Sequence, residues 1–395
     1  MNIRVDPAYP PDPSSPEPCY PSAPGVRRPA RPDPWGARGE AAPGEAGPGE
    51  LVIRTSRAGD DRERDEFVRS HPSSALFHLS GWSRAVEGAL GAQARDLVAL
   101  EDGRVVGVLP LTSCRRVLGG RSWISAPWGV YGGPLAESPR ISERLVAEAL
   151  EQAARAGVGR VELRCREDLG LANLIPSDLY VTYRKPLPER ADEVLNTFPR
   201  TERKALRRAV GRDGLWVEEG HHLRGDLARL FLSSKRSLGS PGLPERWWEA
   251  LETELGDAFV LHAARRGDEL LAVSLSFLHR DELAMYYIGT TPEANRRFHA
   301  TTFLIAACME WGVRHGYRTF DLGRSRKDSG ACVFKANQGF DATPLHYCYA
   351  LLDAAAALPS FHPSNPRTAL LRRTWARLPL WACHALSERL AIFLP

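Results

Sequence analysis

Two stretches of the chain, separated by about 160 residues, repeat one pattern. Residues 156–163 (AGVGRVEL) align with residues 315–322 (HGYRTFDL), with a glycine, an acidic residue and a leucine at matching positions. In each stretch a helical pattern ends at the glycine and a strand-like run follows. The repeat predicts an α+β chain with two copies of one domain, each an antiparallel meander, a helix and a strand that returns into the sheet.

Local patterns place the elements of each copy. In the first copy, an Asp-Gly pair at residues 102–103 separates two β-rich runs, which is typical of a hairpin. Apolar residues at helical spacing predict a helix over residues 138–156 that ends at Gly157. The remaining expected elements are helices at 81–86 and 300–315, and strands at 122–125, 160–164, 259–263, 270–278, 283–289 and 318–323.

The two ends of the chain differ from these copies. Residues 1–50 hold 13 of the 31 prolines, so they predict a disordered arm, either a tether or a dispensable extension. Residues 356–395 predict a basic helical tail, which Pro379 should divide into two short helices. The tail fits an interfacial membrane segment, or a segment that packs on the second domain and buries Trp375 and Trp381, which is the commoner arrangement.

The cysteine content and the apolar runs of the chain indicate the cellular compartment in which it folds. The seven cysteines are odd in number and include no CxxC pair, so a reducing cytosol fits better than a disulfide framework or a zinc ribbon. The chain has no apolar run of about 18 residues and no visible secretory signal. We therefore expect a cytoplasmic protein, with peripheral contact at the inner membrane if the tail binds lipid.

Positive charge is unevenly distributed along the chain. The net charge of +4 does not require a nucleic-acid partner, but residues 200–212 form a predicted basic helix in which Glu202 is the only acid. Its cations are Arg200, Arg203, Lys204, Arg207, Arg208 and Arg212. A solvated helix between the domains and a contact with tRNA both fit this pattern, and a tRNA contact would weaken steeply with salt.

The densest group of polar residues follows the last strand of the second copy. Asp321 and Arg324 fall at the carboxyl end of that strand, where α/β sites often open, and Ser325 comes next. Lys335 and Asn337 lie downstream in the run FKANQGF, so the partly solvated lysine could hold a carbonyl or phosphate oxygen. The alternative is an Asp321–Arg324 ion pair that closes the strand end, with Lys335 on a surface.

Two aromatic groups are further candidates. Tyr286 and Tyr287 point to opposite sides of one strand, so one of them can line a cleft while the other is core; Tyr287 is our candidate. Trp128 and Tyr131 precede a Gly-Gly pair, which predicts either a platform that binds a polar ligand through backbone N–H groups or a tight turn. The histidines show no metal-ligand spacing, so we expect no metal site.

A string of motifs carries a resemblance to a known family. In chain order the motifs are GWSRAV, EDGRVVGVLPL, WGVYGGPLA, LGSPGLP, FDLGRS, FKANQGF and NPRTALLRRTWARLPL. Over roughly residues 70–395 the chain resembles FemAB-type proteins of the GNAT acyltransferase superfamily, in particular those associated with exosortase/PEP-CTERM exopolysaccharide systems. The resemblance implies two tandem GNAT-like domains, at residues 51–190 and 191–355, between the arm (1–50) and the tail (356–395).

The sequence departs from that family in ways that bear on the donor. The subgroup usually has an aromatic residue where this chain has Gln338, and often a Gly-Thr-Gly-like stretch where it has residues 328–330. GNAT acetyltransferases bind the CoA pyrophosphate with a glycine-containing loop before a helix, whereas residues 292–299 contain no glycine. This absence favours a donor other than free acetyl-CoA.

The resemblance implies an acyl- or aminoacyltransferase that acts on an amine or hydroxyl of a cell-envelope or exopolysaccharide acceptor. We expect no resident cofactor; the donor is an acyl carrier, namely aminoacyl-tRNA, acyl-carrier protein or acyl-CoA. Lys335 would stabilise the tetrahedral intermediate and Asp321 would orient the nucleophile. The expected substrate-binding residues are Arg324, Ser325, Tyr287, Asn337, Trp128 and Tyr131. A non-catalytic scaffold or polymer-binding protein of the same pathway is the alternative.

Overall fold

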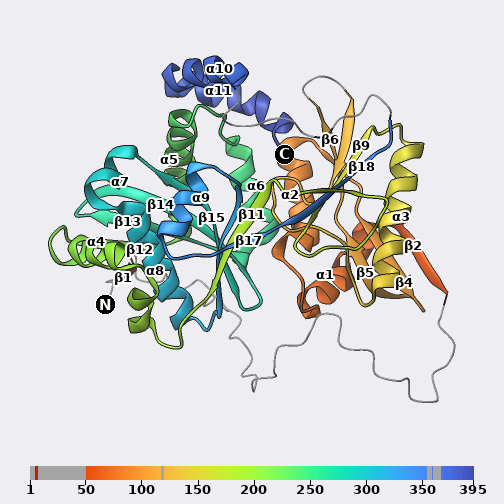
Figure 1. Cartoon of the computed structure of the whole chain (residues 1–395), viewed down its shortest axis with the longest axis horizontal. Coiled ribbons are helices and arrows are strands. Elements are labelled where there is room, and N and C mark those ends of the chain that lie inside the picture. The colour runs from red at the N-terminus through yellow and green to blue at the C-terminus, as the bar shows by residue number, and fades with distance from the viewer. Residues whose placement is uncertain (1–4, 8–49, 117–119, 354–357, 359–365) are drawn as a thin grey trace, which may run out of the picture. The chain divides into compact units, whose positions relative to one another are not determined.

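The computed structural model describes residues 5–7, 50–116, 120–353, 358 and 366–395 (Figure 1). Most of the predicted disordered arm lies outside these residues. The exception is β1 (Val5–Pro7), which pairs in parallel with β12 (Leu215–Glu219). None of the described helices is both long and apolar enough to span a bilayer.

The chain divides into two compact units. We call the described parts of Pro24–Ser177 and His346–Leu358 the first unit, and those of Asp178–Leu345, Pro359–Pro395 and β1 the second unit. The chain thus passes between units at 177/178 and again at 345/346, whereas the sequence prediction put the boundaries after 190 and 355. Strand β11 (Tyr180–Pro186) accordingly pairs within the second unit, and β18 (His346–Leu351) pairs within the first.

Two sheets and three α-helices form the first unit. One sheet has the order β10-β18-β9-β7-β6-β3 and the other has the order β2-β4-β5-β8. Their strands are β2 (Leu51–Thr55), β3 (Gln93–Ala94), β4 (Leu97–Glu101), β5 (Arg104–Leu109), β6 (Thr112–Arg115), β7 (Arg121–Ile124), β8 (Leu135–Ala136), β9 (Arg160–Cys165) and β10 (Ile175–Ser177). The helices are α1 (Asp61–Ser70), α2 (Ser80–Leu90) and α3 (Pro139–Arg155).

Helix α3 closes the core of this unit. Ser138 caps it, with Oγ accepting from the Ile141 N–H at 3.4 Å, and Leu145 and Ala149 are fully buried. The helix packs closely on β5, because a Cβ on Gly107 would lie 2.9 Å from Ile141 Cγ2. The predicted hairpin and the predicted helix at 138–156 are therefore confirmed.

A single eight-stranded sheet organises the second unit. Its order is β1-β12-β13-β14-β15-β16-β11-β17. The strands not yet bounded are β13 (Phe259–Arg266), β14 (Glu269–His279), β15 (Glu282–Thr290), β16 (Thr319–Arg326) and β17 (Ala342–Pro344). The helices are α4 (Arg200–Gly211), α5 (Arg224–Ser237), α6 (Glu245–Leu255), α7 (Pro292–Phe298), α8 (Ala300–Arg314), α9 (Gly330–Asn337), α10 (Pro366–Arg377) and α11 (Leu380–Leu390).

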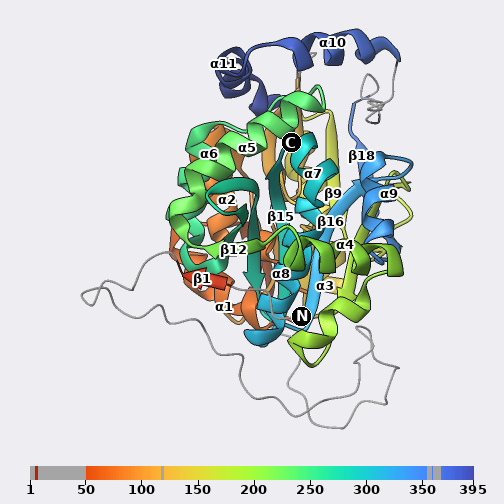
Figure 2. The ribbon, with the colours of Figure 1, turned by 90° about the vertical axis from the view of Figure 1, so that its left-hand side faces the viewer.

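Helix α8 lies at the centre of the second core. Phe303, Leu304 and Ile305 are fully buried, and the apolar face of α4, including Leu206, joins the same cluster. Helix α5 packs against β15, since a Cβ on Gly289 would lie 2.6 Å from the Phe231 nitrogen. Helices α10 and α11 lie beyond α5 in this unit (Figure 2).

The tail has the two short helices that Pro379 predicted, but its packing differs from expectation. Cys383, Ser387 and Ala391 are its buried contacts, whereas Trp381 is 76% exposed. Trp375 is half-buried. The prediction that the second unit buries both tryptophans was therefore wrong for Trp381, because small residues face the unit and the indole points outward.

Candidate active site

The central feature of the second unit is a pair of parallel strands that separate. β15 and β16 pair over only three positions, the last of which is Ala284 with Asp321, although both strands continue. Tyr286 is an extra residue on β15 where its register with β14 shifts, so β15 bulges just past the last pair. Backbone groups on this edge of β15 therefore lose their β16 partners beyond Ala284.

Asp321 shapes the other side of this split. Its side chain is 1% exposed, and Oδ1 accepts from the Gly323 N–H at 2.6 Å and from Thr182 Oγ1 at 3.4 Å. Gly323 has φ +67°, and the register between β11 and β16 shifts at the same place. Asp321 and Gly323 thus form a β-bulge that turns the rest of β16 away from β15.

Lys335 holds this bulge from α9. Its Nζ donates to the carbonyl oxygens of Leu322, Gly323 and Arg324 at 2.6, 2.9 and 3.2 Å. An ammonium has three N–H donors, so the bulge uses all of them. Burial lowers the pKa of Lys335 to about 8, opposed by the negative charge of Asp321.

The other predicted residues of the second unit separate into two groups. Arg324 lies 4.7 Å from the Tyr180 ring centroid, and Ser325 is 5% exposed on the same strand. Both therefore flank the bulge with Asp321 and Lys335, whereas Asn337 is exposed at the end of α9.

Tyr287 packs against Phe231 of α5 and Trp248 of α6. It is 6% exposed in an aromatic cluster, and its hydroxyl accepts from Trp247 Nε1 at 3.1 Å. Burial raises its pKa well above the usual value. Tyr286 is the half-buried ring beside the bulge, since a Cβ on Gly323 would lie 3.9 Å from it.

The sequence analysis missed Lys235. This half-buried residue lies in the last turn of α5, and among the described residues it has no acidic partner. Burial lowers its pKa, and the positive charge of Arg324 lowers it further. Arg184 and Lys335 thus lie near the buried carboxylate of Asp321, with Arg184 Nε 3.9 Å from Oδ2, and Lys235 adds a cation near Arg324. No sequence signal reveals this group, because α5 and β16 are far apart in the chain.

The start of α8 is closed by the chain itself. Thr291 caps α7 by accepting from the Ala294 N–H at 3.1 Å. Asn295 Oδ1 then accepts from the N–H and hydroxyl of Thr301, at 3.0 and 2.8 Å. One of the first N–H groups of α8 is therefore satisfied by a side chain, at the kind of helix start where an anion would bind.

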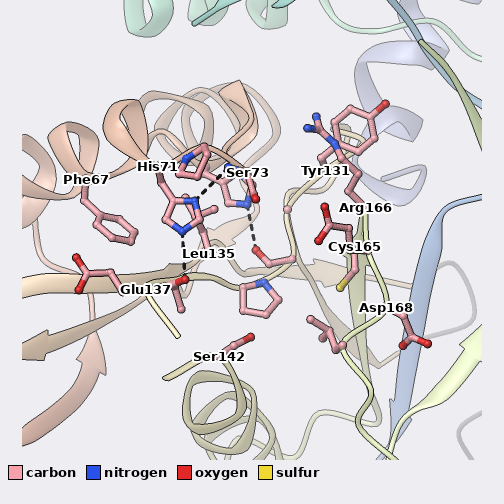
Figure 3. Close-up of a pocket in the computed structure, with 18 of the residues that line it drawn as sticks. Phe67, His71, Ser73, Tyr131, Leu135, Glu137, Ser142, Cys165, Arg166 and Asp168 are labelled. Carbon is pink, nitrogen blue, oxygen red and sulfur yellow. Dashed lines mark hydrogen bonds between the residues drawn. The ribbon is translucent and has the colours of Figure 1, made fainter. Parts of the chain in front are cut away.

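The first unit contains a cavity of about 450 Å³ (Figure 3). Tyr131 lines it, with the Arg166 guanidinium 4.1 Å from its ring centroid. His71 fixes another wall, with Nδ1 accepting from the Ser73 N–H and Nε2 donating to the Ala136 carbonyl. The remaining lining includes the buried Cys165, whose pKa is raised by a hydrogen bond to Cys348 and by burial.

The segment that carries Trp128 and Tyr131 is a tight turn. The Gly132 N–H donates to the Arg164 carbonyl at 2.9 Å, so it is not directed at a ligand. A Cβ on Gly132 would collide with Ala126, and Trp128 is 8% exposed. Tyr131 reaches the cavity by its side chain, in the unit that does not contain Lys335.

Among the described residues, no group of three or more His, Cys, Asp and Glu side chains could hold a metal ion.

Comparison with known proteins agrees with this architecture. Residues 197–336 match the model of the acetyltransferase (GNAT) domain. A crystal structure of FemX superposes with a TM-score of 0.58 at 16% identity, covering 76% of this chain and 97% of FemX. The chain has a tandem GNAT fold, which it shares with FemX.

Two further structures share this tandem GNAT fold. The C-terminal domain of a putative lysylphosphatidylglycerol synthetase from Agrobacterium fabrum gives a TM-score of 0.51 at 18% identity, covering 76% of this chain and 94% of that domain. A tandem GNAT protein from the clavulanic acid biosynthesis pathway gives a TM-score of 0.50 at 15% identity, covering 78% of this chain and 100% of that protein. A comparison with curated protein sequences gives no significant match.

Proposed function

We propose that the protein is an acyl- or aminoacyltransferase whose second unit carries out the transfer at the split between β15 and β16. The separation of these strands beside buried Asp321 and Lys335 carries the proposal. An acyl carbonyl lying along the freed edge of β15 would meet backbone N–H donors there, which can stabilise an oxyanion. The acceptor nitrogen or oxygen bonds to the acyl carbon, the bond to the carrier breaks, and the acceptor's proton leaves with the carrier.

Lys335 and Asp321 act on this reaction through the bulge. Asp321 fixes the Gly323 N–H, and Lys335 binds three successive carbonyl groups, so together they set the width of the split. The Lys335 charge also stabilises negative charge that develops on the carbonyl oxygen. Arg324 and Lys235 add positive charge that favours an anionic group of the donor or acceptor.

The donor we propose is an aminoacyl-tRNA. The Asn295 cap occupies the start of α8, which argues against a CoA pyrophosphate there. Helix α4 lies against α8, where Glu202 accepts from Thr302 Oγ1 at 3.4 Å, and turns its basic side outward. Among the described residues, Arg200, Lys204 and Arg207 have no acidic partner, as a phosphate-binding surface needs. An acyl-carrier protein, also acidic, is the second donor class.

The acceptor we propose is an anionic precursor of a cell-envelope polymer or exopolysaccharide, bound in the first unit. Arg166 above Tyr131 presents a cation and an aromatic ring at one cavity wall. A guanidinium suits a carboxylate or phosphate, and a ring suits a sugar or peptide. We further propose that the reaction takes place in the cytoplasm, at the inner membrane, in a system of the exosortase/PEP-CTERM type, which the sequence motifs resemble.

The test is mass spectrometry of envelope and polysaccharide precursors incubated with purified protein and each donor in turn. An added acyl or aminoacyl mass supports the enzyme. Binding of precursors without any added mass, for every donor, supports a scaffold or polymer-binding protein. A tRNA gel shift that stays absent at low salt removes the tRNA donor while leaving the acyltransferase open to test with the other carriers.

A further inference from the structure

The C-terminal helices are anchored to the second unit by polar contacts on one side. Ser387 Oγ accepts from the Gly242 N–H at 2.9 Å. The Glu388 carboxylate accepts from the Glu245 N–H at 2.9 Å and from Arg246 at 3.0 Å. At the other helix, a Cβ on Gly239 would lie 2.6 Å from the Arg372 carbonyl oxygen, so α10 also packs closely. The two helices therefore present a defined outer side.

Large apolar side chains cover that outer side. Leu370, Leu371 and Trp381 are 74%, 71% and 76% exposed, which is more than any other large apolar side chain among the described residues. Leu238, at the end of α5 beside α10, is 63% exposed. Exposed apolar side chains gathered on neighbouring elements indicate an interaction surface.

The same helices are positively charged. Arg373, Arg377 and Arg389 are exposed and have no acidic partner among the described residues. The acid of this region, Glu388, is already paired with Arg246. The outer side therefore combines leucines and a tryptophan with unneutralised arginines.

We propose that α10 and α11 dock the second unit on an anionic lipid surface. Tryptophan is favoured at the level of lipid headgroups, leucines enter the acyl boundary, and each arginine near an anionic leaflet adds attraction. A groove of about 290 Å³ between α5, α6 and α11, lined by Leu232, Trp248 and Trp381, offers an apolar slot beside the indole. This docking does not depend on the proposed acyl transfer.

The charge distribution favours lipid over a second copy of the chain. In a twofold interface the same patch meets itself, so Arg373 and Arg377 of one copy would approach those of the other. Like charges facing each other oppose such a contact. An anionic bilayer instead supplies the opposite charge over the whole patch.

Co-sedimentation of the full-length chain with phosphatidylglycerol-containing vesicles tests the proposal. We expect binding at low salt that weakens with added salt and is absent with phosphatidylcholine alone. The double variant Arg373→Glu/Arg377→Glu should bind at least about tenfold more weakly. Leu370→Ser/Leu371→Ser/Trp381→Ser should abolish binding.

Matched variants on the first unit control for net charge and apolar surface. Arg140→Glu/Arg144→Glu reverses two exposed arginines with the same four-residue spacing on α3, and Val52→Ser removes an exposed apolar side chain. Both should bind vesicles as the natural chain does. Absence of binding by the natural chain at low salt, or equal loss with the Arg140/Arg144 variant, would overturn the proposal. A triple Ser variant that changes oligomeric state but keeps vesicle binding would overturn it as well.

Discussion

Each of the two units contains a short parallel strand pair, but different groups lie beyond the last position of the pair. In each, a parallel strand pair holds for three positions: β7 with β9 in the first unit, where β7 ends, and β15 with β16 in the second, where both strands continue and separate. The last pairs are Ile124 with Glu162 and Ala284 with Asp321, so the sequence repeat places an acid at the same point in both.

In the first unit, side chains fill the space beside β9 beyond its last pair with β7. Buried Arg164 donates to Glu162 at 2.9 Å and to the Gly129 carbonyl at 3.0 Å, and the tight turn at 125–133 lies alongside. The second unit has Gly323 at the position of Arg164 and uses Lys335 to hold only the backbone. One copy therefore fills the space beside the parallel pair with a buried ion pair, while the other has a glycine, with no side chain, at the matching position.

The largest expected effect is on the stability of the first unit. Arg164→Ala leaves the Glu162 carboxylate buried without its partner, which should cost about 3–5 kcal/mol of unfolding free energy. Urea denaturation followed by circular dichroism measures this loss. A loss below about 1 kcal/mol would show that the filled split does not support the first unit.

The next effect is on transfer by the second unit. Lys335→Ala should lower the rate at saturating substrate by at least about a hundredfold, because the bulge and its charge are lost together. The rate of the natural enzyme should fall as pH rises through about 8, where the Lys335 ammonium loses its proton. Lys335→Arg, which keeps the charge, should retain part of the rate. A folded Lys335→Ala protein with an unchanged rate would remove Lys335 from the mechanism.

A third effect is acid sensitivity of the first unit. His78 is buried beside the cavity, with Nδ1 accepting from the Ala75 N–H and Nε2 donating to the Gly133 carbonyl, and burial lowers its pKa to about 4. Below pH 6.5 the unfolded chain binds a proton that the folded chain does not, so stability falls as pH drops toward 4. The loss at pH 5 should be about 2 kcal/mol relative to pH 7.

His78→Gln should remove that part of the pH dependence, as measured by urea midpoints at pH 7 and pH 5. An identical pH slope in the variant would contradict the assignment.

The smallest expected effect concerns the glycine of the second split. Gly323→Ala should cost about 1 kcal/mol, because the residue has φ +67° and an alanine there is strained. The added methyl also approaches the Tyr286 ring, so transfer should slow more than the stability loss implies. A melting scan and a transfer assay on the same sample separate the loss of stability from the loss of transfer rate. A variant that is destabilised but fully active would show that the split need not be free of side chains.

The repeat predicted the fold because its signal is local. Gly157 and Gly316 end helices in both copies, and each aligned strand, β9 and β16, forms a parallel pair within its unit. The positions of β11 and β18 could not be predicted in this way. Their pairing joins segments more than 100 residues apart along the chain, and such pairing leaves no local pattern.

The sequence predicted which residues gather at the bulge of β16, but it did not predict their contacts. Asp321, Arg324, Ser325 and Lys335 do gather at one bulge. The alternation of side chains along β15 does not say which of Tyr286 and Tyr287 lies beside Gly323, and the structure has the Tyr286 ring there. Lys235 reaches the group only through the packing of α5 on the sheet.

We propose that the second unit carries out the transfer and that the first unit binds the acceptor. Mass spectrometry of acceptor products over time, with the natural chain, Lys335→Ala and Arg166→Ala, tests it most directly. We predict an added acyl mass with the natural chain, at least about a hundredfold slower formation with Lys335→Ala at every acceptor concentration, and recovery of Arg166→Ala at high acceptor. Full activity of folded Lys335→Ala, or an Arg166→Ala defect that no acceptor concentration rescues, would contradict the claim.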